Sequence, residues 1–294
     1  MKILILSSQQ CEDKSVNNGD CFIIDNGQEL VLYDCGNEYY AQFVIEYMED
    51  NGYDTVKVVL SHNDDDHFKG IPKLAKEGKV SEITTVLLLK YVDEILDIID
   101  DGRKSRESLK AQILKQYDNI KQLGGNNLKD AFEHNEIAMG ITIPGPTKDY
   151  ILNAAAKGLD STEGDTIDGE TITNATSIHL CIKVQDKKIL LTGDSSFESV
   201  KEEDLAEYKV IQLPHHGKKE IAEKIFDELD DVVDEVYIVS DNTGNSNGGS
   251  DKLDSKGYDI RNTKDKGMIS LDYNNITLNR KPAGCLSEIF NSRK

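Results

Sequence analysis

The sequence lacks the features that mark several classes of protein. No apolar run approaches the ~18 residues of a membrane-spanning helix, so we expect no membrane segment. The apolar start, Met1–Leu6, is too short for a signal peptide and predicts a first β-strand. The five cysteines are odd in number and include no C-x-x-C pair, which favours free thiols in a reducing compartment over a disulfide framework. These absences predict a soluble, cytoplasmic protein.

Basic residues are also scarce. Lys and Arg number 34 against 54 Asp and Glu, which gives a net charge of −20. A protein that grips a nucleic-acid backbone by its overall charge needs clustered basic residues, so this class is excluded. A small local phosphate site remains compatible with the composition.

Short runs of branched and aromatic residues between turn residues predict β-strands in both halves of the chain. The pair Asn26-Gly27 between two such runs predicts a hairpin, and apolar spacing predicts a helix over Ala41–Met48. Alternating strands and helices without a long linker predict one α/β domain of stacked layers over residues 1–294. The expected strands are Lys2–Ser7, Cys21–Asp25, Glu29–Asp34, Val56–Leu60, Ala138–Ile143, Ser177–Val184, Lys188–Thr192, Tyr208–Leu213, Val236–Ser240 and a closing hairpin of Met268–Tyr273 with Ile276–Asn279.

The middle of the chain has a different pattern. Apolar spacing over Val92–Leu123 predicts two amphipathic helices that break at Asp101-Gly102, within a helical insertion over residues 92–135. The segments Gly158–Asn174 and Asp241–Asp251 have no periodicity and predict loops, and Ile221–Leu229 predicts a helix.

Two histidines stand among three aspartates in the segment Ser61–Gly70, directly after a predicted strand. Imidazoles and carboxylates at this density are costly to pack without a counter-charge. A divalent cation removes the conflict, because it neutralises carboxylates and accepts lone pairs from neutral imidazoles. His62, Asp64 and Asp66 can turn toward one point, with His67 closing from the next turn. The alternative is a solvated acidic turn, and we favour the metal site.

Two further segments end predicted strands on candidate ligands. Pro214–Gly217 contains adjacent histidines that point to different sides, so one can bind a metal while the other faces a substrate, although a surface pair fits equally well. Asp194 follows the strand Lys188–Thr192 and is by itself typical of a turn or a helix N-cap. Because layered α/β proteins gather their sites at the carboxyl ends of strands, the three segments together predict one site.

The order and composition of these segments resemble the metallo-β-lactamase fold hydrolases, and among them the metallo-hydrolase domain of ComEC-type competence proteins. Matches in this order through nearly the whole chain are specific, whereas one alone is not. The matching segments are Asn18–Ile24 (an early Gly-Asp strand motif), Leu32–Gly36 (a D-x-G turn), Ser61–Gly70 (H-x-H-x-D-H), Asn174–Ser177 (an Asn/Ser strand entry), Leu190–Asp194 (L-T-G-D) and Pro214–Gly217 (P-H-H-G).

The resemblance implies an αββα sandwich, in which two β-sheets face each other, helices lie outside and metal ions bind at one edge. It implies as ligands His62, Asp64, Asp66, His67, Asp194 and one of the paired histidines. Of the pair, we expect His216 to be the ligand and His215 to face the substrate. Asp194 would bridge two ions if both are bound.

The sequence departs from the family's pattern at three places. Asp64 stands where the motif has its second histidine, Thr173-Asn174 lacks the additional histidine, and Asp241–Asp251 lacks the late Gly-His-Pro. His179 lies close to the second place, and we predict a packed strand residue there. The ligand set is therefore rich in carboxylates. We expect one or two divalent cations, with Mn²⁺ a rival to Zn²⁺ because oxygen donors suit harder ions.

The resemblance implies hydrolysis, most directly of a phosphodiester by a nuclease or phosphodiesterase. Asp66 would orient the nucleophile while it binds the metal, and His215 would protonate the leaving oxygen. Lys69, Lys218 and Lys219 lie beside the motifs, either to hold a phosphate or as plain solvated lysines. The acidic chain favours a short nucleotide or a single-stranded nucleic acid over a duplex.

Two other functions remain open at this point. The same fold could hydrolyse an ester, a lactone or a thioester. The chain could instead be a non-catalytic module that senses a metal or a nucleotide, or that holds a protein partner through the helices of Val92–Leu123.

Overall fold

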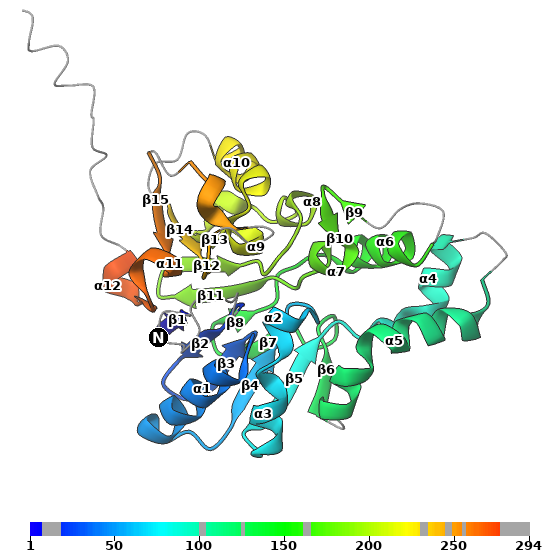
Figure 1. Ribbon diagram of the computed structural model, residues 1–294, viewed down its shortest axis with the longest axis horizontal. Coiled ribbons are helices and arrows are strands. Elements are labelled where there is room, and N and C mark those ends of the chain that lie inside the picture. The colour runs from blue at the N-terminus through cyan, green and yellow to red at the C-terminus, as the bar shows by residue number, and fades with distance from the viewer. Residues whose placement is uncertain are drawn as a thin grey trace, which may run out of the picture.

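Two β-sheets face each other, and helices cover the outer side of each (Figure 1). The computed structural model describes residues 1–7, 19–99, 104–124, 127–160, 166–229, 235–244, 249–254 and 257–276. In spatial order, the first sheet contains β16 (Ile269–Leu271), β1 (Lys2–Ile5), β2 (Phe22–Asp25), β3 (Leu30–Tyr33), β4 (Val56–Val59), β5 (Val80–Thr85) and β6 (Leu128–Asp130). The second contains β15 (Asp259–Asn262), β14 (Val236–Val239), β13 (Val210–Gln212), β12 (Lys187–Leu191), β11 (Leu180–Val184), β8 (Ile141–Thr142) and β7 (Glu136–Ala138).

The apolar strands are explained by burial on both faces. In β1, Ile3 and Ile5 pack between the two sheets, whereas Leu4 packs on the outer side against α1 (Glu38–Asn51). Successive side chains of a strand point to opposite faces, so a strand covered on both sides is apolar throughout. The expected αββα sandwich is therefore confirmed.

The outer helices are positioned by apolar stripes and by caps. Asn37 caps the first turn of α1, because its side chain accepts a hydrogen bond from Tyr40 N, and Gly52 ends the helix at φ 77°. α1 and α3 (Ile71–Lys76) cover the first sheet, and α8 (Phe197–Val200) and α10 (Lys219–Glu228) cover the second. The remaining short elements are α2 (Asp65–Phe68), α7 (Ile172–Ala175), α9 (Pro214–Gly217), α11 (Thr263–Lys266), α12 (Tyr273–Ile276) and the 3₁₀ turns η4 (Leu205–Glu207) and η5 (Ser250–Lys252).

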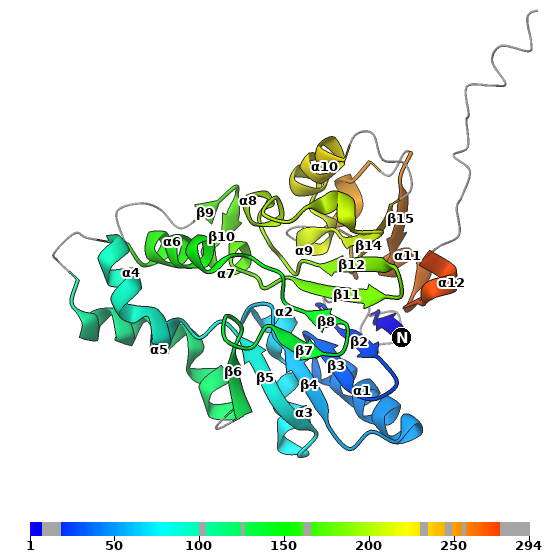
Figure 2. The same ribbon diagram turned by 180° about the vertical axis from the view of Figure 1, so that it is seen from behind.

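A group of helices extends to one side of the sheets in both views (Figures 1 and 2). It consists of η2 (Leu88–Tyr91), α4 (Val92–Ile99), α5 (Arg106–Gly124) and α6 (Lys148–Leu159), which share an apolar cluster. Two helices were expected over Val92–Leu123, and α4 and α5 lie there; the expected break at Asp101-Gly102 lies outside the described residues. The expected insertion over residues 92–135 also contains β6, which pairs in parallel with β5.

Parallel pairing brings the functional segments together. β3, β4 and β5 run parallel in the first sheet, as do β12, β13 and β14 in the second. The carboxyl ends of parallel strands lie at one edge, so each sheet presents the residues that follow its central strands at a common edge.

Some sequence predictions were wrong. The segment Gly158–Asn174 is not a loop throughout: α6 continues to Leu159, and a small hairpin of β9 (Thr166–Ile167) and β10 (Glu170–Thr171) leads into α7, while residues 161–165 lie outside the described ranges. Nor do Met268–Tyr273 and Ile276 form a hairpin, because β16 pairs with β1 and Tyr273–Ile276 is the helical turn α12. Residues 277–279 are not described.

Other predictions are confirmed. β2 and β3 pair antiparallel around Asn26-Gly27, with Asp25 opposite Leu30. Cys21, Cys35 and Cys181 are free, whereas Cys11 and Cys285 lie outside the described residues. None of the helices in the described ranges combines the length and the apolar character that crossing a bilayer requires.

Candidate metal centre

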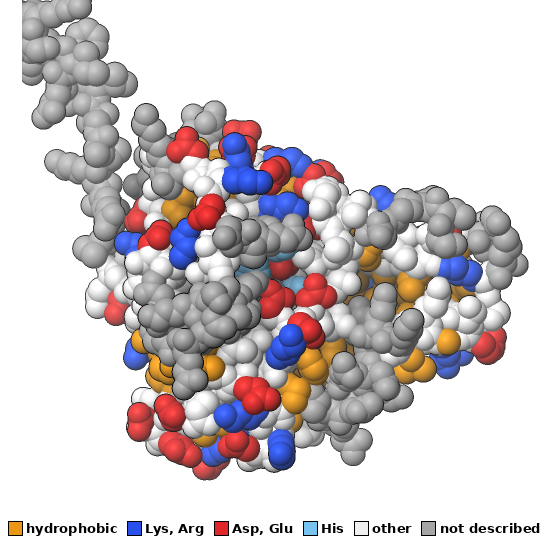
Figure 3. Space-filling view, viewed as in Figure 1, with side chains coloured by type: hydrophobic (Ala, Val, Ile, Leu, Met, Phe, Trp, Pro, Cys, Tyr) orange, Lys and Arg blue, Asp and Glu red, His pale blue; other side chains and the backbone are white. Residues whose placement is uncertain are grey.

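Histidine and aspartate side chains meet where the central strands of both sheets end. Asp34 follows β3, His62 follows β4 by three residues, Asp194 follows β12, and the histidine pair follows β13. α2 then carries His67 into the same space. In the space-filling view, histidines (pale blue) lie beside acidic side chains near the middle of the molecule (Figure 3).

His67 lies at the centre of this cluster and is fully buried. Its Nδ1 lies 2.8 Å from Asp34 Oδ2, and because a carboxylate can only accept, Nδ1 donates. Its Nε2 lies 3.3 Å from Asp194 Oδ1. Burial opposes a charge on the ring, but Asp194 and Asp34 raise the pKa of His67 well above its ordinary value. The cluster therefore attracts positive charge, which either a proton or a metal cation can supply.

His62 is held by two serines. Its Nδ1 lies 2.9 Å from Ser61 Oγ and 3.1 Å from Ser177 Oγ. Ser61 donates its hydroxyl hydrogen to Asp34 Oδ2 at 2.6 Å, so its oxygen accepts from His62 Nδ1 and leaves the Nε2 lone pair unprotonated. Burial and the neighbouring His67 lower the pKa of His62 to about 3, which keeps the ring neutral at physiological pH.

The two adjacent histidines are fixed in the same way. His216 Nδ1 donates to the carbonyl of Ser240 at 2.8 Å, and His215 Nδ1 donates to Glu170 Oε2 at 2.7 Å. His216 Nε2 lies 3.3 Å from Asp66 Oδ2, and His215 Nε2 lies 3.7 Å from Asp194 Oδ2. In all four imidazoles an acceptor thus fixes Nδ1 and turns Nε2 toward a carboxylate, which is the arrangement that metal-binding histidines require.

An unusual backbone turn places both histidines of the pair in the site. His215 (φ 49°, ψ 58°) and His216 (φ 56°, ψ 28°) are both left-handed, and Gly217 follows at φ 79°. Left-handed backbone costs a non-glycine residue roughly 1–2 kcal/mol. Adjacent positions predict side chains that point to different sides, but the turn keeps the two ring centroids 5.8 Å apart and both rings near Asp194.

Several buried atoms of the cluster have no hydrogen-bond partner. Within the described part of the chain, these include His62 Nε2, His67 Nε2, Asp194 Oδ1 and Asp20 Oδ1. Burying a polar atom without a partner is costly, and a cation bound by His62, His67 and Asp194 would satisfy three of these four atoms. Ligand atoms of His62, His67 and Asp194 lie within 4.8 Å of one another, as do those of Asp66, His67 and His216. The residues therefore fit a divalent cation.

Five of the residues expected to bind metal converge: His62, Asp66, His67, Asp194 and His216. Asp64 is different, since it lies at the rim with its side chain 47% exposed and its Oδ2 3.8 Å from His62 Nε2. His215 belongs to none of the ligand groups found among the described residues, whereas His216 belongs to two of them. The roles of these residues remain predictions.

Sequence reasoning did not assign three further residues to the site. Asp34 and Asp20 were noted only as parts of motifs, although Asp34 directly follows β3 and Asp20 follows Gly19 just before β2. Asp34 fixes His67, and Asp20 Oδ1 lies 3.5 Å from His216 Nδ1. Glu170 gave no signal, because it lies in a segment expected to be a loop.

The three lysines beside the motifs are paired with carboxylates. Lys69 lies 2.8 Å from Asp65, and Lys219 lies 3.5 Å from Glu223. Lys218 is mostly buried and pairs with Glu170, the residue that also binds His215. Of the three lysines, Lys218 is therefore the one connected to the site.

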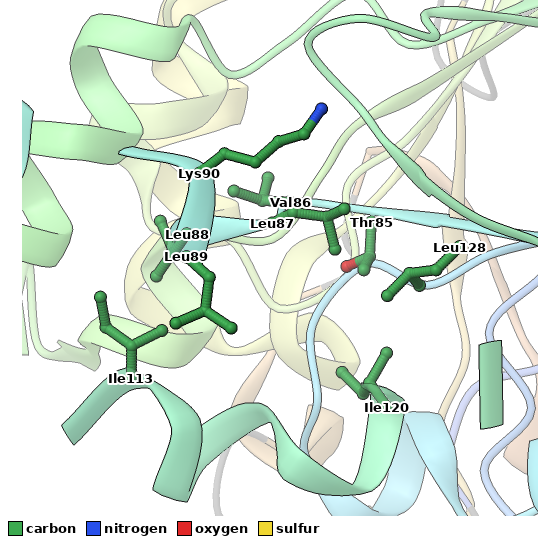
Figure 4. A pocket seen from close by; sticks show the side chains of 9 residues that line it. All are labelled: Thr85, Val86, Leu87, Leu88, Leu89, Lys90, Ile113, Ile120 and Leu128. Atoms are coloured by element: carbon green, nitrogen blue, oxygen red, sulfur yellow. The ribbon is translucent and has the colours of Figure 1, made fainter. Parts of the chain in front are cut away.

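An apolar cavity of about 250 Å³ lies apart from the metal centre, between α5 and the chain that follows β5 (Figure 4). It is lined by residues 85–90 together with Ile113, Ile120 and Leu128. Lys90, on its wall, pairs with Glu133 and Asp130. The cavity shares no residue with the candidate ligand groups.

Comparison with known families agrees with this geometry. A sequence model of the metallo-beta-lactamase superfamily matches residues 15–240, which include every candidate ligand. The chain belongs to the metallo-β-lactamase superfamily. This membership supports a metal-dependent hydrolase and implies divalent metal ions at the cluster.

The solved structures to which the chain is similar share little sequence identity with it. Tm1679, described as a metal-dependent hydrolase of the β-lactamase superfamily, superposes with a TM-score of 0.50 at 15% identity, covering 92% of this chain and 98% of its own. Igni18, a metallo hydrolase from the archaeon Ignicoccus hospitalis KIN4/I, has a TM-score of 0.48 at 12% identity and covers 93% and 100%. YhfI from Bacillus subtilis has a TM-score of 0.38 at 15% identity and covers 72% and 69%. No curated protein sequence shows significant similarity to the chain.

Proposed function

We propose that this metallo-β-lactamase superfamily member is a phosphodiesterase that uses one or two divalent cations, Zn²⁺ or Mn²⁺. The observation that carries the proposal is the set of four imidazoles whose Nδ1 atoms are fixed and whose Nε2 atoms face buried carboxylates. The ligands would be His62, Asp66, His67, Asp194 and His216, with Asp64 at the rim. A cation held there supplies Lewis acidity, which acidifies water and withdraws electron density from a phosphoryl oxygen.

The protein's own groups would position the reactants. Asp66 Oδ2 faces the same space as His216 Nε2, 3.3 Å away, and would accept a hydrogen bond from the attacking water. Asp194 lies between His67 and His215, and these imidazoles, together with His216, hold the pKa of its carboxyl well below the usual range despite burial. It would therefore remain ionised throughout the reaction.

His215 is the candidate general acid. Glu170 fixes its Nδ1–H, and the same carboxylate pairs with Lys218. A carboxylate behind an imidazole stabilises the protonated ring, so Nε2 can deliver a proton to a leaving alkoxide oxygen. Lys218, with its side chain 19% exposed, would add positive charge beside a phosphate.

The substrate class is supported by two features of the sequence. The order and composition of the motifs resemble those of the metallo-hydrolase domain of ComEC-type competence proteins, and this resemblance supports a phosphodiester. The net charge of −20 opposes tight binding of a duplex and favours a short nucleotide or a single strand.

The proposal is tested by elemental analysis followed by paired assays. Protein purified without chelator should contain Zn or Mn, and it should hydrolyse bis-p-nitrophenyl phosphate faster than p-nitrophenyl acetate. Hydrolysis of the acetate alone would refute the phosphodiesterase in favour of an ester, lactone or thioester hydrolase. Hydrolysis of neither by metal-loaded protein would favour the non-catalytic module.

Two neighbouring carboxylates provide a matched pair of variants. Asp66→Asn should lose metal and activity, because Asp66 faces His216. Asp65→Asn should retain both, because Asp65 is 78% exposed and pairs only with Lys69 in the salt bridges of the described residues. Equal effects of the two substitutions would contradict the proposed ligand set.

A further inference from the structure

A buried polar network lies behind the candidate metal centre, and the proposed reaction does not use it. His179 and Ser199 are completely buried, and His179 Nε2 lies 3.0 Å from Ser195 Oγ and 3.1 Å from Ser199 Oγ. On its other side, His179 Nδ1 lies 3.2 Å from Glu203 Oε1, and Tyr208 donates to the second oxygen of Glu203 at 3.0 Å. The network therefore links α8 and the turn after it to the residue that follows Asp194.

The position of the Asp194 carboxylate depends on its backbone. Among the described residues, Asp194 Oδ1 has no hydrogen-bond partner that meets the geometry of a hydrogen bond, although it lies 3.3 Å from His67 Nε2, so its position also depends on the backbone that carries it. The turn that carries Asp194 is held at its main chain. Thr192 N and Gly193 N donate to Gln212 Oε1 at 3.0 and 3.2 Å, and Asp194 N donates to Ser177 Oγ at 3.3 Å.

Ser195 closes this turn on the side that faces His179. Its hydroxyl donates to Thr192 O at 2.7 Å, and the same oxygen lies 3.0 Å from His179 Nε2. Glu203 fixes the other edge of the same ring. Burial opposes the charge of Glu203, but the bond from His179 holds the pKa of this carboxyl below its ordinary range.

Gly145 leaves room for the pair of His179 and Glu203. A Cβ at Gly145 would lie 2.4 Å from Glu203 Oε1 and 3.5 Å from His179 Nδ1, so a side chain at this position would collide with the carboxylate. Gly145 O accepts from His179 N at 2.7 Å. Backbone and side chain of His179 are thus both fixed, as a rigid support for the turn requires.

We propose that His179, held by Glu203, is a positioning residue that supports the Asp194 turn through Ser195 and so raises the affinity of the centre for a divalent cation. The inference rests on the proposed metal site. Groups that orient a metal ligand from behind typically change metal affinity by about 10–100-fold when they are removed. His179 is buried, as the sequence predicted, and in this proposal it changes the metal affinity of the centre without being a ligand.

The test compares two buried serines that contact the same ring. Ser195→Ala removes the contact between His179 and the Asp194 turn together with the bond to Thr192 O, whereas Ser199→Ala removes the contact between His179 and α8. The affinity of full-length protein for Zn²⁺ and Mn²⁺ is measured by competition with a chromophoric chelator. We expect Ser195→Ala to weaken binding about 10–100-fold and Ser199→Ala to leave it unchanged. Thermal unfolding of the metal-free proteins measures the loss of packing separately.

A double-mutant cycle tests whether His179 acts on metal binding through its contact with Ser195. His179→Gln should also weaken binding. Adding Ser195→Ala to it should cause a smaller loss than Ser195→Ala causes alone, because both changes break the His179–Ser195 contact and only the bond to Thr192 O is then left to lose. If Ser195→Ala does not fold, His179→Gln against Ser199→Ala decides the question. Equal losses in both serine variants, wild-type affinity in Ser195→Ala, or additive losses in the cycle would overturn the inference. A wild-type protein that binds neither cation would refute the proposed metal site itself.

Discussion

Replacement of Asp34 by asparagine should weaken metal binding although Asp34 is not a candidate ligand of the proposed site. Asp34 is fully buried and accepts three hydrogen bonds: Ser61 N at 2.7 Å on Oδ1, and Ser61 Oγ at 2.6 Å and His67 Nδ1 at 2.8 Å on Oδ2. The Ser61 backbone N–H can only donate, so the asparagine oxygen must take the Oδ1 position. The amide NH₂ then occupies the Oδ2 position.

This orientation reverses two imidazole tautomers. The new NH₂ group donates to His67 Nδ1, which moves the ring proton to Nε2. Its second hydrogen is donated to Ser61 Oγ, so the Ser61 hydroxyl turns to donate to His62 Nδ1, 2.9 Å away. Both Nε2 atoms would then carry protons where a cation needs lone pairs. Loss of one such supporting group typically costs about 10–100-fold in affinity, and with two ligands affected we expect about 100-fold, or about 2.8 kcal/mol.

The assay is chelator competition with Zn²⁺ and Mn²⁺, with circular dichroism to show that the variant is folded. Asp25→Asn is the matched control, because Asp25 ends β2 of the same sheet, accepts hydrogen bonds from Tyr47 of α1 and from Tyr53, and forms no hydrogen bond or ion pair with a histidine of the described residues. A folded Asp34→Asn variant that binds as tightly as the wild type would refute the tautomer argument.

Three further predictions concern other parts of the molecule. Gly19→Ala should lower the unfolding temperature more than Gly27→Ala does. Both glycines have a positive φ, but only at Gly19 would an added Cβ meet the backbone, 1.5 Å from the carbonyl oxygen of Asp66 in α2. Left-handed strain should destabilise each variant by roughly 1–2 kcal/mol, and the clash should add about 1–3 kcal/mol at Gly19. Glu170→Gln should lower kcat by up to about 100-fold while metal affinity stays unchanged, because Glu170 bonds to the proposed acid His215 and to Lys218, neither of which is a proposed ligand. A parallel loss of metal would contradict this. Burial opposes a charge on His67, but the neighbouring carboxylates raise the pKa of this ring. Below that pKa the ring is protonated, so a cation must displace a proton in order to bind. Affinity should rise with pH up to that raised pKa, and binding heats should differ between buffers of different ionisation enthalpy.

The sequence predicted the position of site residues best where those residues come shortly after a strand. His62, Asp194 and His216 each come shortly after an apolar strand, and parallel pairing brings such ends to one edge whatever the details of the loops. Asp64 shows the limit of this argument. It was expected among the ligands from motif spacing, yet as the residue before α2 it lies at the exposed rim.

The parts of the site that the sequence did not reveal depend on contacts between distant segments. Glu170 bonds to His215, which lies 45 residues later in the chain. It belongs to a hairpin whose two strands are two residues long each, too short to show a hydrophobic periodicity. His179 was predicted to be packed, and it is buried, but its link to Glu203 depends on how α8 folds back over the sheet. A local signal for α6 did exist, since Thr147 caps it by accepting a bond from Tyr150 N.

The arrangement of donors limits how many cations the centre can hold tightly. His67 belongs both to the group with His62 and Asp194 and to the group with Asp66 and His216, but its Nε2 can bind one ion at a time. Among the expected ligands, an ion bound by Asp66, His67 and His216 leaves His62, Asp194 and the half-exposed Asp64 to a second ion. The second position therefore has one nitrogen donor and more access to water, so protein ligands replace less of the ion's hydration shell there. We expect one tight and one weak cation per chain, so dialysis against dilute chelator should leave one ion bound, and two ions of equal affinity would contradict this division of the ligands.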